Sequence, residues 1–490
     1  MKRFAAAVAA FGLGSAAGTL IQVLKGKIAA LLLGTAGMGV LNQATAVWSL
    51  LTTVSGLGVG SGAVKRIALA RAAGDDAAIA RQATSALIAV GLCSLAVALA
   101  ATPLAGWLSA LLFHDGGERR VLLLLVAWGV PFAVCAQVYR AMLSAARETR
   151  TLVLAQVWSD LIGLALFGVL IWRLDLFGAV LALSLLHATK FALLYAGARR
   201  CYGRVAVTPQ PARFAWDELR ENLVYGANGL LLVATGIVVV LIVSRWIIGA
   251  YGLDAAGLFS TAWKVATVYL AAIYASAGSY YFPALAVCDD DRRLGAQIDE
   301  ALTVYLYLVP PLMAAIVLSA EWLIPLLFSA AFAPAAALLL LLLPGDLCRV
   351  VAETLGLSLL ARRHLRAYCG LYFAWAAIYL GLTALLLPRL QLTGVALAYL
   401  LSQALQLVLA AIVVGRTFAY RIGHTAASAL LRGALLVAVA VAAALTLPQL
   451  PARIAAAAAI AAAWLLLSWR DLHFRELAAG LFRRLGLRPT

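Results

Sequence analysis

The sequence predicts an all-α protein that crosses a membrane many times, and its composition and long apolar runs support this prediction. Of 490 residues, 64% are hydrophobic and only 12% are charged. A soluble domain is about half apolar and about a quarter charged, whereas the mean hydropathy of this chain is +0.98. These values exclude a soluble enzyme and a disordered or collagen-like chain.

Fourteen apolar stretches are long enough to span a bilayer as helices, which requires about 20 residues each. Short polar or basic segments separate them. The first stretch is better interpreted as a membrane helix than as a cleavable signal, because its apolar run continues to Gly34. The stretches lie near 5–33, 38–62, 84–106, 121–145, 151–171, 176–198, 223–247, 257–285, 301–320, 335–360, 367–387, 393–414, 429–447 and 452–469.

The distribution of Lys and Arg predicts that both termini lie in the cytoplasm. With the N-terminus inside, 26 of the 38 Lys and Arg fall in the N-terminus, the inner loops and the C-terminal tail, and six fall outside. Cytoplasmic loops are enriched in these residues, so the net charge of +17 indicates topology and not nucleic-acid binding. The tail 470–490 alternates apolar residues with arginines at helical spacing, which predicts a basic amphipathic helix on the inner leaflet.

Two glycine-containing turns indicate that the chain has two similar halves. The segment 33–41 follows the first stretch, and the segment 248–259 follows the seventh. Six spans lie between the turns, as in parallel repeats related by an axis along the membrane normal. We therefore expect an N-lobe, a cytoplasmic linker, a C-lobe, two further spans and a cytoplasmic tail. These segments are 1–200, 201–222, 223–420, 421–469 and 470–490.

We single out nine ionisable side chains inside the expected spans, where insertion scales put their cost at roughly 2.5–3.5 kcal/mol each at mid-depth. Such groups usually face a cavity or a partner, so they are candidate functional residues. Six are basic and three are acidic, a balance that fits an anionic cargo better than a cationic one. The nine are Lys25, Lys27, Arg140, Asp160, Lys190, Lys264, Asp346, Arg349 and Glu353.

Two groups of these charges also have purely structural explanations. Asp160 and Lys190 could form a structural ion pair between neighbouring helices. Asp346, Arg349 and Glu353 follow the spacing i, i+3, i+7, which places all three on one helix face. They could neutralise one another, or they could act as a proton-sensitive switch.

The sequence gives no sign of enzyme chemistry. No HExxH, GxSxG or paired-carboxylate motif lies in a water-facing segment, and the glycine-rich stretch 55–62 lacks the ending of a phosphate-binding loop. The six cysteines have no CxxC spacing. We therefore expect no enzymatic activity, no metal and no cofactor. A membrane-embedded polymerase or ligase is the weaker alternative, because such enzymes usually carry a sizeable periplasmic loop.

Two motifs near the N-terminus resemble those of bacterial O-antigen translocases. The first is KGKIAALLLGTAGMGVLNQ at residues 25–43, and the second is GLGVGSGAVKRIA at residues 56–68, followed by Gly74 and Asp75. On these motifs the chain resembles the polysaccharide transporter family, which includes O-antigen translocases and lipid III flippases. This family belongs to the multidrug/oligosaccharidyl-lipid/polysaccharide exporter superfamily.

The resemblance implies two six-helix lobes in a V around a central cavity, with two further C-terminal helices here. It implies a flippase that moves an undecaprenyl-pyrophosphate-linked oligosaccharide, such as an O-antigen repeat unit for lipopolysaccharide biosynthesis. Movement would run from the cytoplasmic to the periplasmic leaflet of the inner membrane by alternating access, coupled to H⁺ or Na⁺. Expected partners are membrane lipids, a polysaccharide polymerase and a chain-length regulator.

The candidate residues take three roles in this interpretation. The cations that would replace the lost hydration of phosphate with charge-assisted hydrogen bonds are Lys25, Lys27, Arg140, Lys190 and Lys264. Lys65 and Arg66 would lie at the inner mouth, where positive-inside topology alone would also place them. The candidates for ion or proton coupling are Asp160, Asp346, Arg349 and Glu353.

Two alternatives come from the same superfamily. A multidrug/cation antiporter would be expected to depend on acidic residues in its spans. A lipid II flippase is the second alternative, since those proteins have fourteen spans whereas many O-antigen translocases have twelve.

Overall fold

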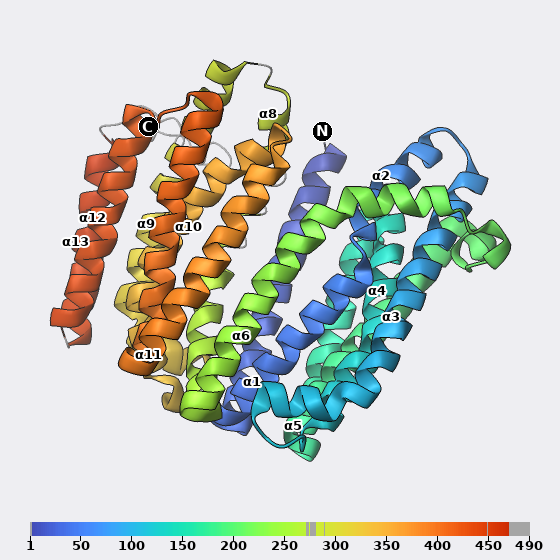
Figure 1. The fold of residues 1–490 in the computed structure, drawn as a ribbon, viewed down its shortest axis with the longest axis horizontal. Coiled ribbons are helices and arrows are strands. Elements are labelled where there is room, and N and C mark those ends of the chain that lie inside the picture. The colour runs from blue at the N-terminus through green and yellow to red at the C-terminus, as the bar shows by residue number, and fades with distance from the viewer. Residues whose placement is uncertain (1, 271–273, 275–280, 289, 448, 470–490) are drawn as a thin grey trace. The chain divides into compact units, whose positions relative to one another are not determined.

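The computed structural model describes residues 2–270, 274, 281–288, 290–447 and 449–469. Over these residues the chain forms twelve α-helices and two short 3₁₀ helices, and no strand occurs among them. The predicted all-α fold class is therefore confirmed (Figure 1). The expected amphipathic tail 470–490 lies outside the described residues.

The chain divides into two compact units. The first contains 1–257 with 327–329, and the second contains 258–326 and 330–490. The sequence-based boundaries instead place the division at the linker 201–222, and these lobe boundaries stay a prediction.

The first unit contains five complete helices, one 3₁₀ turn and most of a sixth helix. They are α1 (Lys2–Gly56), α2 (Val59–Ala72), α3 (Asp76–Phe113), α4 (Arg120–Ala145), α5 (Thr149–Val207), η1 (Pro211–Arg213) and α6 (Trp216–Val268) as far as Gly257. Helix α4 is the most buried, with 56% of its most apolar window inside the protein. It therefore forms the centre against which the other helices of this unit pack.

The second unit contains the end of α6 and seven further elements. They are α8 (Phe282–Ala286), α9 (Asp291–Leu327), η3 (Ala330–Phe332), α10 (Ala335–Ala361), α11 (Leu365–Phe418), α12 (His424–Thr446) and α13 (Leu450–Trp469). Helices α9 and α10 are the most buried, at 61% and 67% of their apolar windows, so they form the core of this unit.

Nine helices of the described chain are long and apolar enough to cross a membrane, which confirms a polytopic membrane protein. Four of them have a central bend at a residue with positive φ, namely Gly34 in α1, Asp175 in α5, Gly252 in α6 and Gln391 in α11, and α5 has a second such residue, Gly203, near its end. Every one of these bends falls between two of the expected apolar stretches. Each long helix thus contains two stretches joined by a tight bend, and the total of fourteen spans stays a prediction.

Candidate functional site

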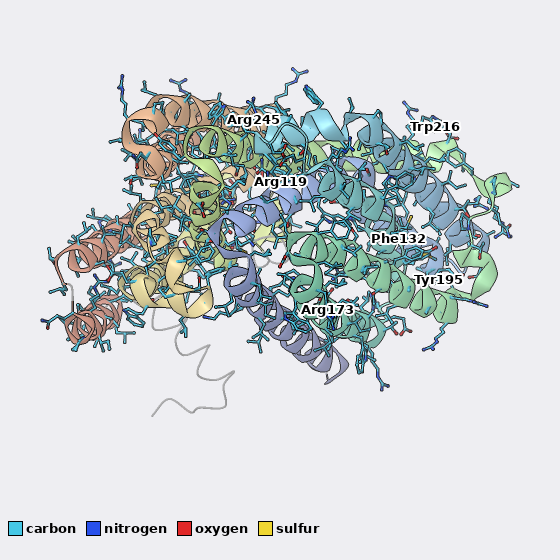
Figure 2. All side chains as sticks on the ribbon, turned by 90° about the horizontal axis from the view of Figure 1, so that it is seen from below. Arg119, Phe132, Arg173, Tyr195, Trp216 and Arg245 are labelled. Carbon is cyan, nitrogen blue, oxygen red and sulfur yellow. The ribbon has the colours of Figure 1, made fainter. Side chains whose placement is uncertain are left out.

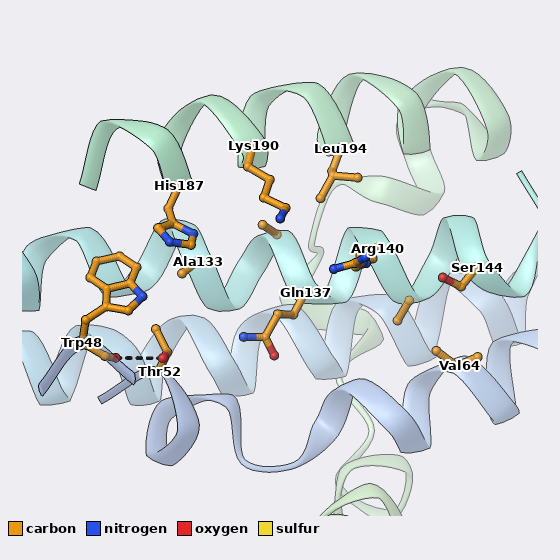
Figure 3. Close-up of a pocket in the computed structure, with 12 residues that line it drawn as sticks. Trp48, Thr52, Val64, Ala133, Gln137, Arg140, Ser144, His187, Lys190 and Leu194 are labelled. Atoms are coloured by element: carbon orange, nitrogen blue, oxygen red, sulfur yellow. Dashed lines mark hydrogen bonds between the residues drawn. The ribbon is translucent and has the colours of Figure 1, made fainter. Parts of the chain in front are cut away.

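A cavity of about 570 Å³ lies within the first unit (Figure 3). Helices α1, α2, α4 and α5 form its walls. Its lining residues are Trp48, Thr52, Val64, Ala133, Ala136, Gln137, Arg140, Ala141, Ser144, His187, Lys190 and Leu194. Two of the five predicted cavity cations, Arg140 and Lys190, are among them.

Helical periodicity brings these side chains to one place. On α4, the lining residues from Ala133 to Ser144 recur at intervals of three and four, so they share one face of the helix. On α5, His187, Lys190 and Leu194 follow the same spacing. The α4 face consists largely of Ala and Ser, whose small side chains leave room beside the longer Gln137 and Arg140.

Lys190 is part of a hydrogen-bonded series of three side chains, Lys190, Gln156 and Asp160, which all belong to α5. Its Nζ donates a hydrogen bond of 2.7 Å to Oε1 of Gln156, and Nε2 of Gln156 donates one of 2.6 Å to Oδ2 of Asp160. Asp160 is only 6% exposed. The ion pair considered between Lys190 and Asp160 is therefore mediated by an amide, which keeps the two charges apart.

Lys25 joins this group from α1. It interacts electrostatically with Asp160, and its Nζ lies 3.2 Å from the position that a Cβ on Gly163 would occupy. Lys190 in turn interacts electrostatically with Arg140 and with Lys25. Lys25 and Lys190 thus lie near the buried Asp160, and Arg140 adds a third positive charge near Lys190, so the site is electropositive.

Aromatic and neutral polar groups complete the cavity wall. The ring of His187 stacks on Trp48 with centroids 4.5 Å apart and an interplanar angle of 24°. Gln137 lies on the opposite wall from His187 and next to Arg140 along α4 (Figure 3). The site therefore offers cationic donors beside flat apolar rings, a combination suited to an anionic ligand that also carries sugar or isoprene groups.

The remaining predicted basic residues lie elsewhere. Lys27 is half-buried in α1 but does not line the cavity. Lys65 and Arg66 follow the lining residue Val64 on α2 and do not themselves contribute to the wall. Lys264 belongs to the second unit, where its side chain is exposed next to Trp263.

The acidic candidates of the second unit separate into two arrangements on α10. Asp346 is fully buried and accepts hydrogen bonds from the hydroxyls of Tyr269, at 3.1 Å, and Tyr399, at 2.6 Å. Arg349 and Glu353 form an ion pair of 2.8 Å with each other. The self-neutralised cluster expected from the spacing thus holds for Arg349 and Glu353, whereas Asp346 is held by Tyr269, just after the end of α6, and by Tyr399 of α11.

Sequence reasoning did not identify several residues of the first cavity. Gln156 was missed although it stands four residues before Asp160, a spacing at which helical side chains interact. His187 was missed although it stands three residues before Lys190. Polar residues one helical turn from an in-span charge were the available signal in both cases. Trp48 gave no comparable signal, because an isolated Trp in an apolar helix is ordinary.

The helical fold, with nine described helices long and apolar enough to span a bilayer, defines the chain as a polytopic membrane protein. The family model described as "Polysaccharide biosynthesis protein" matches residues 5–287, more than half of the chain. The chain therefore belongs to this family, which confirms the family expected from the motifs.

Relatives and solved structures agree with this assignment. The lipid III flippase of Escherichia coli K12 is 25% identical over 405 residues, which cover 79% of this chain and 93% of that protein. The lipid III flippase of Shigella flexneri gives the same values. These relatives are flippases, so the expectation of a transport protein and not an enzyme is confirmed.

Two solved structures share the fold. The lipid II flippase MurJ in an inward closed conformation has a TM-score of 0.70 at 12% identity, covering 95% of this chain and 99% of that chain. An inward-facing multidrug resistance MATE family transporter of the MOP superfamily has a TM-score of 0.69 at 17% identity, with coverages of 82% and 94%. At these identities the likeness establishes the architecture.

Proposed function

We propose that the protein is a flippase for an undecaprenyl-pyrophosphate-linked oligosaccharide, with an O-antigen or similar polysaccharide repeat unit as its glycan. It moves this lipid from the cytoplasmic to the periplasmic leaflet of the bacterial inner membrane by alternating access. Both termini of the chain lie in the cytoplasm. The cluster of Lys25, Arg140 and Lys190 in the first unit is the observation that supports the proposal most directly.

The physical difficulty of this transport lies in the head group. A diphosphate and a hydrated glycan lose their hydration in hydrocarbon, and the loss is prohibitive unless other hydrogen bonds replace it. The Arg140 guanidinium can bind a phosphate through two parallel hydrogen bonds, and the Lys190 ammonium adds a mobile point charge. Trp48 and His187 supply a flat surface for the sugar adjoining the diphosphate.

The charge of the cavity argues against the cation antiporter. Its wall contains Arg140 and Lys190 and no acidic residue among the described side chains that line it. A cationic drug entering this cavity would meet like charges. The likeness to the MATE family transporter and to the lipid II flippase supports the shared fold, while the curated relatives favour a lipid-linked glycan as cargo.

We further propose that an H⁺ or Na⁺ gradient drives the transport. The carboxylates available inside the membrane are Asp160 in the first unit and Asp346 and Glu353 in the second, with Arg349 neutralising Glu353. Asp346 is the strongest candidate because it is fully buried and has hydroxyl partners instead of a counter-charge at hydrogen-bond distance. A polysaccharide polymerase and a chain-length regulator would act on the translocated unit.

Removal of the cavity cations tests the function. In a strain lacking the gene, Lys190→Gln and Arg140→Gln should each restore surface polysaccharide at least about tenfold less well than the wild type, because each loses a charge-assisted hydrogen bond. Lipid-linked glycan should accumulate in the inner leaflet. The matched control is Arg150→Gln, which removes an exposed positive charge from the same unit and should behave as the wild type.

If the protein were instead a cation antiporter, Lys190→Gln and Arg140→Gln would leave surface polysaccharide unchanged. If both cavity variants restore polysaccharide fully, or if the strain lacking the gene keeps normal surface polysaccharide without another exporter, the flippase proposal is wrong.

A further inference from the structure

A second cavity, of about 580 Å³, lies in the first unit and shares no lining residue with the first. It is formed where the end of α2, the start of α3 and the end of α5 meet η1. Its lining residues are Arg71, Asp76, Ala77, Ile79, Ala80, Arg81, Cys201, Tyr202, Ala212 and Arg213. No residue of the proposed translocation site takes part in it.

The lining of this cavity is predominantly cationic. Three arginines face one carboxylate, that of Asp76. Arg81 also contacts Asp75 at 3.8 Å, but both side chains are nearly half exposed, so this ion pair is weak. Arginine is the side chain best matched to phosphate oxygens, because its planar guanidinium can donate two parallel hydrogen bonds. The cavity therefore favours a phosphate-bearing ligand.

The walls of the cavity are fixed by contacts to the rest of the unit. The Arg71 guanidinium lies over the ring of Tyr202, 5.2 Å from its centroid, and the Tyr202 hydroxyl donates a hydrogen bond of 2.8 Å to the Met142 carbonyl. The segment after η1 is attached to α3, because the Ala215 backbone N–H donates to Oγ of the fully buried Ser85 at 2.9 Å. The expected linker thus forms a wall of a defined cavity.

The residues around the cavity have the composition expected at a membrane surface. It lies at the ends of apolar helices, beside the point where the span within α5 ends at Gly203. Phe214 and Trp216 come just after η1, and their side chains are 39% and 59% exposed. Trp216 is labelled in Figure 2. Exposed aromatic rings at helix ends are typical of the level of the lipid head groups. Basic pockets between helices at this level are suited to anionic lipid head groups.

We propose that this cavity binds the phosphate of an anionic phospholipid, with Arg71 and Arg213 as its principal ligands and with Phe214 and Trp216 against the glycerol and upper acyl region. A bound phospholipid would hold the end of α5 against α2 and α3. Because this lipid is retained and not transported, the proposal does not depend on the identity of the flippase cargo.

Lipid binding by the full-length protein in detergent tests this proposal. After delipidation, phosphatidylglycerol should raise the unfolding temperature more than phosphatidylcholine does. The double variant Arg71→Gln/Arg213→Gln should bind phosphatidylglycerol at least about tenfold more weakly in native mass spectrometry, since two charge-assisted contacts are lost. Arg293→Gln removes an exposed arginine of the second unit and serves as the control with wild-type binding.

Two further measurements distinguish a lipid phosphate from free phosphate, and a lost ligand from a misfolded variant. Inorganic phosphate at the same concentration should stabilise the protein less than phosphatidylglycerol; equal stabilisation would indicate a free-anion site and overturn the proposal. The variant Arg71→Lys keeps the charge and should retain part of the binding, which distinguishes a lost ligand from a lost fold. Equal binding of both lipids, or unchanged binding by the double variant, would also overturn it.

Discussion

Gly39 of α1 and Gly257 of α6 pack against each other's helix in a reciprocal arrangement. A Cβ on Gly39 would overlap the carbonyl oxygen of Leu253 and lie 3.1 Å from the Gly257 nitrogen. A Cβ on Gly257 would overlap the carbonyl oxygen of Thr35 and lie 3.3 Å from the Gly39 nitrogen. The two helices can approach this closely only because neither glycine has a side chain.

The predicted internal repeat would account for this reciprocity. Thr35 and Leu253 are separated by the same number of residues as Gly39 and Gly257. The bend directly before Thr35 and the bend directly before Leu253 also have similar backbone angles. Gly34 has φ 65° and ψ −165°, and Gly252 has φ 83° and ψ 179°.

A second pair of bends, in α5 and α11, repeats the correspondence. Asp175 has φ 48° and ψ −131°, and Gln391 has φ 54° and ψ −139°. The sequences around them also correspond, with Arg-Leu-Asp-Leu-Phe-Gly at 173–178 and Arg-Leu-Gln-Leu-Thr-Gly at 389–394. The repeat predicted from the glycine turns thus extends to a second bend in each half.

The first prediction concerns this glycine contact. Gly39→Ala and Gly257→Ala should each destabilise the protein by about 1–3 kcal/mol, because the new methyl group overlaps backbone that cannot rotate away. The control Gly168→Ala, in α5, has open space at its Cβ and should be neutral or slightly stabilising. Thermal unfolding of the purified variants measures the difference. Equal stability of all three would mean that the two helices separate freely.

The second prediction is a pH dependence at the loop between α3 and α4. Asp115 accepts hydrogen bonds from Ser109 Oγ and from the backbone N–H groups of Gly117 and Arg119, and it pairs with the Arg119 guanidinium at 3.3 Å. Burial acts to raise the pKa of this carboxyl, but these donors outweigh it and hold the pKa below its ordinary value.

The lowered pKa of Asp115 determines in which direction stability changes with pH. The stabilisation by Asp115 is present above the unfolded-state pKa, near 3.9, and is lost as the pH falls through the folded-state pKa. Asp115→Asn should therefore lower the unfolding temperature at pH 7, and the gap to the wild type should narrow below about pH 4. The exposed Asp217→Asn is the matched control. A gap that stays constant down to pH 3 would contradict this account.

Several features of the fold and the site could be predicted from the sequence because they depend on local pattern. The four helix bends fall where hydropathy is interrupted, and the Arg349–Glu353 pair follows from its spacing of four residues. The partners of Asp346 could not be predicted, since Tyr269 and Tyr399 are 77 and 53 residues away in the sequence.

The same limit applies to the cavity cations. The first unit brings together Lys25, Arg140 and Lys190, whereas Lys264 belongs to the second unit. Hydropathy cannot separate them, because all four lie in apolar stretches of the sequence. Which in-span charge faces which cavity depends on the rotation of each helix about its axis. That rotation is set by packing contacts such as the one between Gly39 and Gly257.

The third prediction tests Asp346 as the proposed coupling carboxylate. Asp346→Asn keeps one acceptor oxygen and replaces the other with an NH2 donor, so one of the two tyrosine hydroxyls loses its acceptor, at a cost of about 1–3 kcal/mol in stability. Asp346→Asn should also lose the response of transport to an imposed H⁺ or Na⁺ gradient in proteoliposomes. Glu300→Gln removes an exposed carboxylate of the same unit and should keep that response. A gradient-sensitive Asp346→Asn variant would place the coupling group elsewhere.

The fourth prediction concerns Gln156, which links Lys190 to Asp160 in the first unit. Gln156→Leu keeps a similar volume but removes both hydrogen bonds, so the buried Asp160 loses its donor at a cost of about 1–3 kcal/mol. Released from Gln156, the Lys190 ammonium is drawn toward Asp160 and away from the cavity, and transport should fall. Gln156→Glu leaves Lys190 an acceptor but sets a second carboxylate one turn from Asp160, where like charges repel.

Both variants should therefore lower the transport of lipid-linked glycan. Gln156→Glu should also be less stable than the wild type, as Gln156→Leu is. The control Gln22→Leu replaces an exposed glutamine of α1 and should leave stability and transport unchanged. If Gln156→Leu transports as well as the wild type, transport does not depend on the amide that links Lys190 to Asp160, and this account of Gln156 is wrong.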